Sequence, residues 1–456
     1  YTGTVTSNSV TITIPANNLD NLIDGTYTIT ADVDDVHGNS AATVTSSSFI
    51  VDTVVPTLSN VQLSSNNANS SYAKVNDVVT LTFTASETIG TPTVTYQSGG
   101  AAIVDTSITY NNTTGNTWTA AYTANSSDTN GSVTYSIAFA DLAENNGVAV
   151  TSGTGTVTFD KTTPSFQSLT ATDGTYIIGE TLDITVAWDE TVIVTGTPTL
   201  TLSNSATASY LSGTNSSSLV FRYTVVEGTD SADLQVSQYN GTITDLAGNS
   251  AGAVSGDLGS VEIDATTPTL SSVSIASNNA TTTLAKAGDV VTLTFTASEP
   301  IQTPTVTFLS DGDAINNTSI TYNNTSGDTW TAAYTTHADD SDGNVTYSIA
   351  FSDTDGNNGV AVTSGSGSVR FDDTLPSLSS VSLASNNTNN TSYSQVNDVV
   401  TLTFTATETI QTPTVTFESG GDAINDTSIT YNNTSGDTWT AAYTANSSDS
   451  EGSVTY

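Results

Sequence analysis

Residues 79–85 read Val-Thr-Leu-Thr-Phe-Thr-Ala, and this stretch decides the fold. Its apolar members share one parity, and threonines hold the other. Because successive side chains of a β-strand point to opposite faces, the stretch predicts a strand with Val79, Leu81, Phe83 and Ala85 on a core face. The threonine face is expected to be solvated, since β-branched residues suit an exposed strand surface.

The same alternation recurs along the chain. Further apolar sets of one parity are Trp118, Ala120 and Tyr122; Val133, Tyr135, Ile137 and Phe139; Leu182, Ile184, Val186 and Trp188; and Leu219, Phe221, Tyr223 and Val225. Turn-rich links separate these sets, and no stretch has the period of a helix. An all-β fold follows.

A junction motif appears four times and divides the chain. It ends in a proline and carries an aspartate four residues earlier, in the pairs Asp52 and Pro56, Asp160 and Pro164, Asp264 and Pro268, and Asp372 and Pro376. The prolines lie 108, 104 and 108 residues apart, so one repeat is a little over 100 residues long. We therefore expect five modules, at residues 1–55 (partial), 56–163, 164–267 (divergent), 268–375 and 376–456 (truncated).

The second, fourth and fifth modules are near copies. Residues 117–122 read Thr-Trp-Thr-Ala-Ala-Tyr, and the same six letters return at 329–334 and 438–443. Residues 1–55 align only with the later part of a module, and residues 452–456 match the middle of one. We expect a segment of a longer polypeptide.

About seven short alternating strands and a core tryptophan in about 100 residues are typical of an immunoglobulin-like (Ig-like) β-sandwich. The chain contains no cysteine, so the sandwich is expected to lack the disulfide of antibody domains. The sequence thus predicts a tandem array of Ig-like β-sandwiches without disulfides.

Charge excludes several kinds of partner. The 456 residues include 45 acidic and 5 basic residues, which gives a net charge of −40. Nucleic acids bind clustered Lys and Arg, whereas Lys74, Lys161, Arg222, Lys286 and Arg370 are scattered. Neither nucleic acid nor direct membrane contact is expected for this segment.

The motifs resemble those of a known class of repeats. The Asp-Thr-x-x-Pro junction, strands ending in Ser-Glu or Thr-Glu, and the Asp-x-x-Gly-Asn hairpin look like tandem bacterial or archaeal Ig-like repeats of large secreted surface proteins. Giant repetitive adhesins, biofilm-associated proteins and surface-layer proteins carry such repeats. The resemblance covers essentially the whole chain and implies a location at the cell surface or outside the cell, with spacer modules reused for many roles.

Acidic residues are expected to gather at one pole of each module. Strands of an Ig-like sandwich alternate in direction, so the incoming linker and the loops after the second and sixth strands meet at the same pole. The candidate sets are Asp52, Glu87 and Asp141 in the second module; Asp160, Asp189, Glu190, Asp245 and Asn249 in the third; Asp264, Glu299, Asp353 and Asp355 in the fourth; and Asp372, Asp373 and Glu408 in the fifth.

Carboxylates packed together repel one another unless a cation neutralises them. Ca²⁺ accepts six to eight oxygen ligands in a flexible geometry. The sequence therefore predicts Ca²⁺ at the junctions, restricting the hinges between modules. Turn formation by Asp, Asn and Gly is the simpler explanation for many of these residues, although it does not account for their recurrence in three separate segments.

Other chemistry is less well supported. His37 and His337 are the only imidazoles, and Asn125 and Asn446 replace His337 in the neighbouring copies, so we expect exposed loop residues and not a catalytic triad or a zinc site. No aromatic platform groups the carboxylates as a glycosidase would need. We expect no enzyme. The sequons, for example at Asn111 and Asn240, leave glycosylation open.

Two functions remain. The first is a structural repeat region that projects a distal domain or builds a filament or surface lattice through neighbouring modules and other copies of the polypeptide. The second is an adhesin stalk whose modules bind a glycan or a partner protein directly. The similarity of three modules favours the first function, and the divergent residues 164–267 are where the second would be sought.

Overall fold

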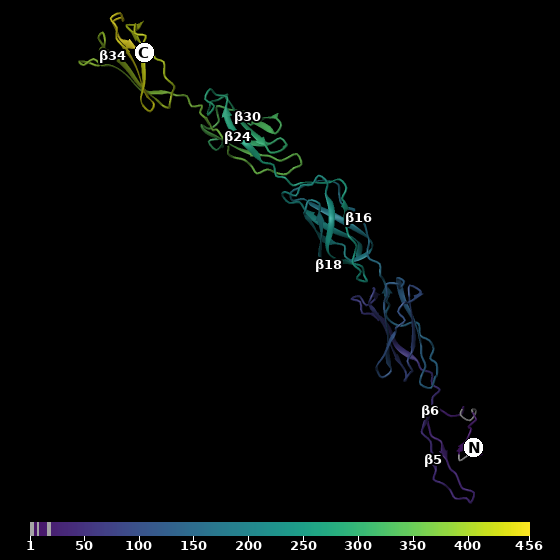
Figure 1. The fold of residues 1–456 in the computed structure, drawn as a ribbon. Coiled ribbons are helices and arrows are strands. Elements are labelled where there is room, and N and C mark those ends of the chain that lie inside the picture. The colour runs from purple at the N-terminus through teal and green to yellow at the C-terminus, as the bar shows by residue number, and fades with distance from the viewer. Residues whose placement is uncertain (1–3, 7–8, 16–19) are drawn as a thin grey trace. The chain divides into compact units, whose positions relative to one another are not determined.

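The computed structural model describes residues 4–6, 9–15 and 20–456 (Figure 1). These residues form strands, turns and loops, and none of them is helical. Within the described ranges there is accordingly no helix long and apolar enough to cross a membrane. The all-β prediction is confirmed.

The second module is a sandwich of two sheets. The strand order is β12-β13-β9-β7 in one sheet and β11-β10-β14-β15-β8 in the other, where only β15 and β8 run parallel. These are the D-E-B-A and C′-C-F-G-A′ orders of an Ig-like domain, so the predicted fold is confirmed. The strands are β7 (Leu58–Ser65), β8 (Tyr72–Ala73), β9 (Val78–Ala85), β10 (Thr93–Ser98), β11 (Ala101–Ala102), β12 (Thr109–Thr114), β13 (Thr117–Thr123), β14 (Gly131–Ala138) and β15 (Thr158–Phe159).

The core of this module follows the alternation of the sequence. Leu81 and Phe83 of β9 are completely buried between the sheets. From the opposite sheet, the Tyr96 hydroxyl donates to the Ala120 carbonyl at 2.7 Å, and the rings of Tyr96 and Tyr122 lie 4.7 Å apart between centroids. Apolar burial and one hydrogen bond across the sandwich thus fix the two sheets against each other.

The fourth module repeats this plan. Its sheets have the orders β24-β26-β30-β29 and β25-β32-β31-β27-β28. The strands are β24 (Leu270–Ser277), β25 (Leu284–Ala285), β26 (Val290–Ala297), β27 (Thr305–Ser310), β28 (Asp313–Ala314), β29 (Thr321–Ser326), β30 (Thr329–Thr335), β31 (Gly343–Ala350) and β32 (Val369–Phe371).

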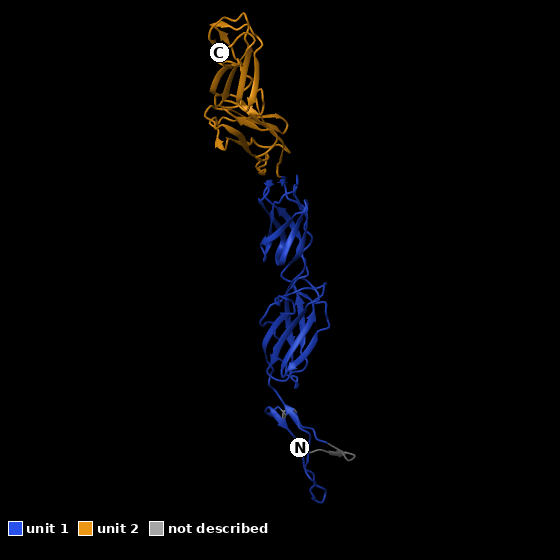
Figure 2. Ribbon diagram, turned by 90° about the vertical axis from the view of Figure 1, so that its left-hand side faces the viewer, with its two compact units in different colours: residues 1–266 blue, residues 267–456 orange. Residues whose placement is uncertain are grey.

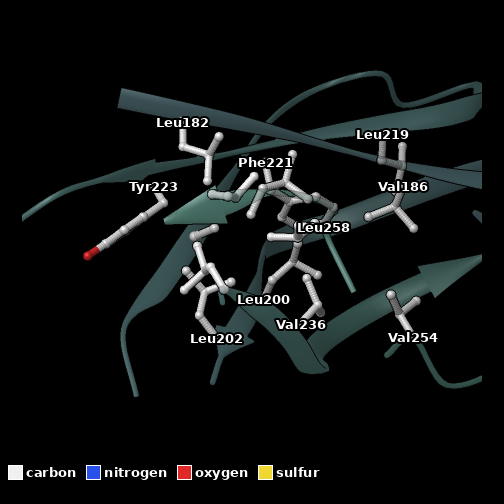
Figure 3. Packing of buried hydrophobic residues seen from close by; sticks show 14 of the residues in the cluster. Leu182, Val186, Leu200, Leu202, Leu219, Phe221, Tyr223, Val236, Val254 and Leu258 are labelled. Carbon is white, nitrogen blue, oxygen red and sulfur yellow. The ribbon is translucent and has the colours of Figure 1, made fainter. Parts of the chain in front are cut away.

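The third module is built around one long strand. β18 (Thr181–Leu202) runs for 22 residues and pairs with β16, β20, β19 and β21. Figure 3 shows the buried side chains of this module, among them Leu182 and Val186 of β18 packed near Leu219 and Phe221 of β20. The other strands are β16 (Phe166–Thr170), β17 (Gly174–Ile177), β19 (Thr207–Ser212), β20 (Ser216–Thr224), β21 (Gln235–Thr244), β22 (Gly256–Asp257) and β23 (Val261–Asp264).

The first and fifth modules have fewer paired strands. Residues 4–51 contain three strand pairs, β1 (Thr4–Thr6) with β2 (Ser9–Thr11), β3 (Gly25–Tyr27) with β6 (Phe49–Val51), and β4 (Thr30–Ala31) with β5 (Val44–Thr45). The fifth module has the sheets β33-β34-β38-β37 and β36-β35-β39. Its strands are β33 (Leu378–Ser385), β34 (Val399–Ala406), β35 (Glu418–Ser419), β36 (Asp422–Ala423), β37 (Thr430–Ser435), β38 (Thr438–Thr444) and β39 (Val454–Thr455).

The chain divides into two compact units, residues 1–266 and residues 267–456 (Figure 2). The first unit holds the first three modules and two of their junctions. The second unit holds the fourth and fifth modules. Each unit is described by itself below.

Candidate metal centre

A hairpin after β14 holds the first of the candidate ligands. Asp141 is only 5% exposed, and its Oδ1 accepts the backbone N–H groups of Ala143 at 2.8 Å and Asn145 at 2.9 Å. The Asn145 amide donates to Asp141 Oδ2 at 2.7 Å and to the Asp52 carbonyl at 2.9 Å. A short acidic side chain at a turn satisfies these donors, and the same hairpin ties the incoming linker to the module.

Three carboxylates meet at this junction. Asp52 follows β6 in the linker, Glu87 follows β9, and Asp141 follows β14. One carboxylate oxygen from each lies within 4.8 Å of the other two. The structure therefore brings together, in the second module, the three segments that the sequence reasoning assigned to one pole.

The carboxylates of this group affect one another. Burial, together with the charges of Asp52, Asp141 and Asp24, raises the pKa of Glu87 above its ordinary value. Burial also acts to raise the pKa of Asp141, but the hydrogen bonds from Asn145 and the hairpin backbone outweigh it and hold that pKa below its ordinary value. The surroundings of Asp141 thus favour its ionised form. Among these carboxylates, Glu87 is the one whose negative charge its surroundings disfavour.

The third module repeats the arrangement. Asp245 is 2% exposed, and its two carboxylate oxygens each accept a hydrogen bond of 2.8 Å from Asn249, one from the backbone and one from the amide. The Asn249 amide also donates to the Asp160 carbonyl in the linker at 3.0 Å. Asp160, Glu190 and Asp245 form a second group whose carboxylate oxygens lie within 4.8 Å of one another.

Glu190 is strongly perturbed in this second group. Burial comes first among the causes, followed by the charges of Asp160, Asp245 and Asp189, and together they raise the pKa of Glu190 from 4.5 to about 7. Asp189 has the smallest effect of these charges, and its Oδ1 accepts the backbone N–H of Ser165 at 2.8 Å. Asp189 thereby positions the first residues of the module and lies outside the group of three.

Two sequence-predicted sets have a different standing. Asp264 belongs to the first unit and Glu299, Asp353 and Asp355 to the second, so their grouping stays a prediction. The set of Asp372, Asp373 and Glu408 is not among the groups of three found in the described ranges. Asp353 is buried and holds its hairpin as Asp141 does, accepting the backbone N–H of Asn357 at 2.9 Å. Asp355 is exposed.

The fifth-module set has a cation beside it. Arg370 Nη1 donates to Asp372 Oδ2 at 2.9 Å, so that carboxylate has an ion-pair partner. Glu408 has one buried oxygen that accepts no hydrogen bond from the described residues. His37 and His337 both lie exposed in loops.

Sequence reasoning missed a second feature of the linkers. Asp24 accepts two hydrogen bonds from Thr53, at 2.9 Å from its N–H and 2.8 Å from its hydroxyl. Asp230 and Asp342 accept the hydroxyls of the linker threonines Thr266 and Thr374, and each also accepts the backbone N–H of the residue before the threonine. An acidic or amide residue before the sixth-strand glycine was the available signal, at Asp24, Asn130 and Asp342.

The junction between the second and third modules contains two further contacts. Lys74 Nζ donates to the Gly248 carbonyl at 2.7 Å, and the Asn67 amide donates to the Ala247 carbonyl at 2.8 Å. Both donors belong to the second module and both acceptors to the Asp245 hairpin of the third. These contacts link two loops that are about 175 residues apart in the sequence. No sequence pattern could have indicated that the two loops meet.

The ligand atoms at both groups are oxygens. Three carboxylates without histidine or cysteine are a hard donor set, which suits Ca²⁺ or Mg²⁺ and disfavours zinc and copper. The described residues form two ion pairs of arginine with aspartate, Arg222 with Asp183 and Arg370 with Asp372, and neither of them neutralises either group. The residues present therefore fit a calcium ion.

Comparison with known proteins identifies no family for this chain. No protein-family model and no curated protein matches the sequence. Among solved structures, an I-band fragment of titin is 12% identical, covers 71% of this chain and 99% of its own, and has a TM-score of 0.27. The tandem Ig repeats of Dlar are 10% identical over 70% of this chain and 99% of their own, with a TM-score of 0.16. The strand orders given above are what identify this chain as a tandem array of Ig-like β-sandwiches.

Proposed function

We propose that the chain is the repeat region of a non-enzymatic, extracellular structural polypeptide, in which Ca²⁺ at module junctions restricts the linkers. The observation that carries the proposal is the pair of groups, Asp52 with Glu87 and Asp141, and Asp160 with Glu190 and Asp245. Each group joins one linker carboxylate to two carboxylates of the following module.

The geometry supports a role in linker stiffness. An ion held by Asp160, Glu190 and Asp245 would connect the segment before Pro164 to β18 and to the hairpin after β21. A linker residue held in this way loses conformational freedom, and the binding energy of the ion offsets that loss. The hydrogen bond from Asn249 to the Asp160 carbonyl supports this role, because it ties the linker to the Asp245 hairpin.

The extracellular location is supported by composition and by the resemblance to secreted bacterial or archaeal repeats. Calcium modules that work outside cells bind the ion with dissociation constants of about 10⁻⁴–10⁻³ M, within reach of three carboxylates and a few waters. A net charge of −40 is also more easily accommodated where divalent cations are abundant.

Calorimetric titration of the chelator-treated chain with Ca²⁺ tests the proposal. We expect binding that weakens at least about 10-fold in a Glu87→Gln, Glu190→Gln double variant, since each change removes one anionic ligand. The matched control is Glu144→Gln with Glu262→Gln, because both of those glutamates are exposed and lie outside the two groups. Terbium luminescence offers a second readout, since Trp188 precedes Glu190 by two residues in β18.

Trypsin digestion tests the linker. The chain has five Lys and Arg residues, and Lys161 lies in the linker next to Asp160. We expect Ca²⁺ to slow cleavage after Lys161 in the parent chain and in the control variant, but not in the double variant. Absence of calcium binding in the parent chain, or equal binding by the double variant, would contradict the metal proposal.

A further inference from the structure

The second module carries a pair of hydrogen-bond donors beside the linker to the third module. Asp77 Oδ2 accepts the Asn67 amide at 2.6 Å and the backbone N–H of Lys74 at 2.8 Å. Lys74 follows Ala73 of β8, whose carbonyl accepts the backbone N–H of Asp160 at 2.8 Å. Asn67 and Lys74, which we call the donor pair, are thus held by one carboxylate at the start of the linker.

The fourth module contains the same local structure. Asp289 Oδ2 accepts the Asn279 amide at 2.9 Å and the backbone N–H of Lys286 at 2.9 Å. The arrangement therefore arises within the loop of a module, and no neighbouring module is needed to form it. A carboxamide has two N–H donors and an ammonium group has three, so both side chains of the pair retain donors for a further partner.

The donor pair of the second module reaches the Asp245 hairpin of the third. The Asn67 amide donates to the Ala247 carbonyl at 2.8 Å, and Lys74 Nζ donates to the Gly248 carbonyl at 2.7 Å. Gly248 has a φ of +86°, in the left-handed region that favours glycine. A β-carbon at this position would lie 3.4 Å from Lys74 Nζ, so glycine also permits the close approach of the two loops.

The tip of this hairpin is buried. Ala247 is 1% exposed, yet it does not belong to the core cluster of the third module. The core of its own module therefore does not account for its burial. The contact between the donor pair and the hairpin is packed as well as hydrogen-bonded, which favours one relative position of the two loops.

The linker itself is held against the second module. Lys161 Nζ donates to the carbonyls of Ser126 at 2.9 Å and Asp128 at 2.7 Å. The Asn130 amide donates to Asp160 Oδ1 at 2.9 Å, and the Asn130 side-chain oxygen accepts the backbone N–H of Lys161 at 3.0 Å. Asp160 and Lys161 are therefore fixed before the chain enters the third module.

The third module holds the linker from the other side. The Asn249 amide donates to the Asp160 carbonyl at 3.0 Å, and the backbone N–H of Gly252 donates to the Pro164 carbonyl at 3.0 Å. Neighbouring domains of one chain normally move relative to each other unless their interface prevents it. A rotation of the third module about this linker would have to break the bonds from the donor pair, since both acceptors lie on the hairpin that carries Asn249.

From these contacts we infer that the donor pair is a docking surface for the Asp245 hairpin, and that it holds the second and third modules as one rigid pair without any metal ion. The chemistry of the partner is defined by two consecutive backbone carbonyls at the tip of an Asp-x-x-Gly-Asn turn. The inference goes beyond the proposed function, because the docking contact uses an amide, an ammonium group and carbonyls, and none of the carboxylates assigned to calcium.

Distances between spin labels test the inference, because the chain has no cysteine of its own. Thr134→Cys in β14 and Ser237→Cys in β21 place one label on each module, at residues that are exposed within strands. Pulsed electron paramagnetic resonance of the full chain in chelator then measures the distribution of the distance between the labels. We expect one narrow distribution, and the same distribution after Ca²⁺ is added.

Removal of the donor pair should release the two modules. We expect Asn67→Ala with Lys74→Ala to broaden the distribution at least about 2-fold, because the hairpin then lacks both donors. The matched control is Asn279→Ala with Lys286→Ala, which makes the same change in the same local structure of the fourth module. Lys74→Met is a milder variant, since the bond to Asp77 uses the Lys74 backbone, and it should broaden the distribution by less than the double variant does.

Trypsin digestion in chelator gives an independent readout. Cleavage after Lys161 should be at least about 3-fold faster in the double donor-pair variant than in the control, since the linker opens more often. A broad distribution in the parent chain, or a donor-pair variant with a distribution as narrow as that of the control, would overturn the inference. A distribution that narrows only when Ca²⁺ is added would also overturn it and leave the proposed function intact, whereas absence of calcium binding would contradict the proposed function alone.

Discussion

The second and fifth modules contain nearly the same stretch in two different conformations. Residues 91–98 read Thr-Pro-Thr-Val-Thr-Tyr-Gln-Ser, and residues 412–419 read Thr-Pro-Thr-Val-Thr-Phe-Glu-Ser. The first stretch contains the six-residue strand β10, whereas the second contains only the two-residue β35. The sequence pattern supplies the capacity to form a strand, and β10 realises it along its whole length through its ladder with β14.

The largest expected difference between the two modules concerns their cores. Phe83 and Phe404 have the same neighbours in sequence, and both are buried. Phe404 also lines an open apolar groove on the fifth module. Phe83→Ala is expected to destabilise its module by about 3–5 kcal/mol, and Phe404→Ala by less, since its surroundings can relax. Hydrogen exchange of peptides from each module in the full chain measures both effects. Equal losses of protection would mean that the two cores are equally closed.

Proline substitution tests the conformational difference directly. Thr95 lies within the β10 ladder, and Thr416 lies in the unpaired stretch. Thr95→Pro is expected to cost about 3 kcal/mol by removing a donor and fixing the backbone, whereas Thr416→Pro should cost under about 1 kcal/mol. Denaturant unfolding followed by the same exchange experiment gives the comparison. A large cost at Thr416 would show that this stretch is already paired.

The smallest expected effect concerns the third module, whose acidic junction is complete like that of the second. The raised pKa of Glu190, about 7 against an ordinary 4.5, means that the folded state binds its proton more tightly than the unfolded state. Without metal, the contribution of Glu190 to stability should therefore be greatest below pH 4.5, decline as the pH rises to about 7, and change little above that.

Melting temperatures in chelator at pH 5 and pH 8 measure this dependence. Glu190→Gln should reduce the decline between the two values, and the exposed Glu262→Gln should leave it unchanged. Added Ca²⁺ should raise the melting temperature most at pH 8, where the carboxylates are ionised. A decline that persists in Glu190→Gln would assign the pH dependence to other groups.

Most of the fold was predictable from the sequence, because one physical rule governs it. The parity of Leu81 and Phe83 in β9, and of Leu219 and Phe221 in β20, gave the buried faces correctly. The pairing of the strands was harder to predict, because the parity of apolar residues does not specify which strand lies alongside which. The length of β18 was missed for that reason. Trp118 illustrates a smaller difference, being a partly buried residue at the margin of its cluster.

The site was predictable only where the alternating direction of successive strands determines which segments meet. Alternating strand direction brought Asp52, Glu87 and Asp141 to one pole, and the structure does bring them together. Asp189 could not be distinguished from Glu190 by position, and only its hydrogen bond to Ser165 separates their roles. The Lys74 contact depends on how two sandwiches meet, which the sequence of either module leaves undetermined.

The long strand of the third module has a mechanical consequence. β18 pairs with β20 through its first half and with β21 through its second, and Glu190 lies between the two halves. A force applied along β18 would load both ladders, because they share this one strand. Neither ladder could yield without loading the other, so this module should break as a whole where its neighbours could lose strands one at a time.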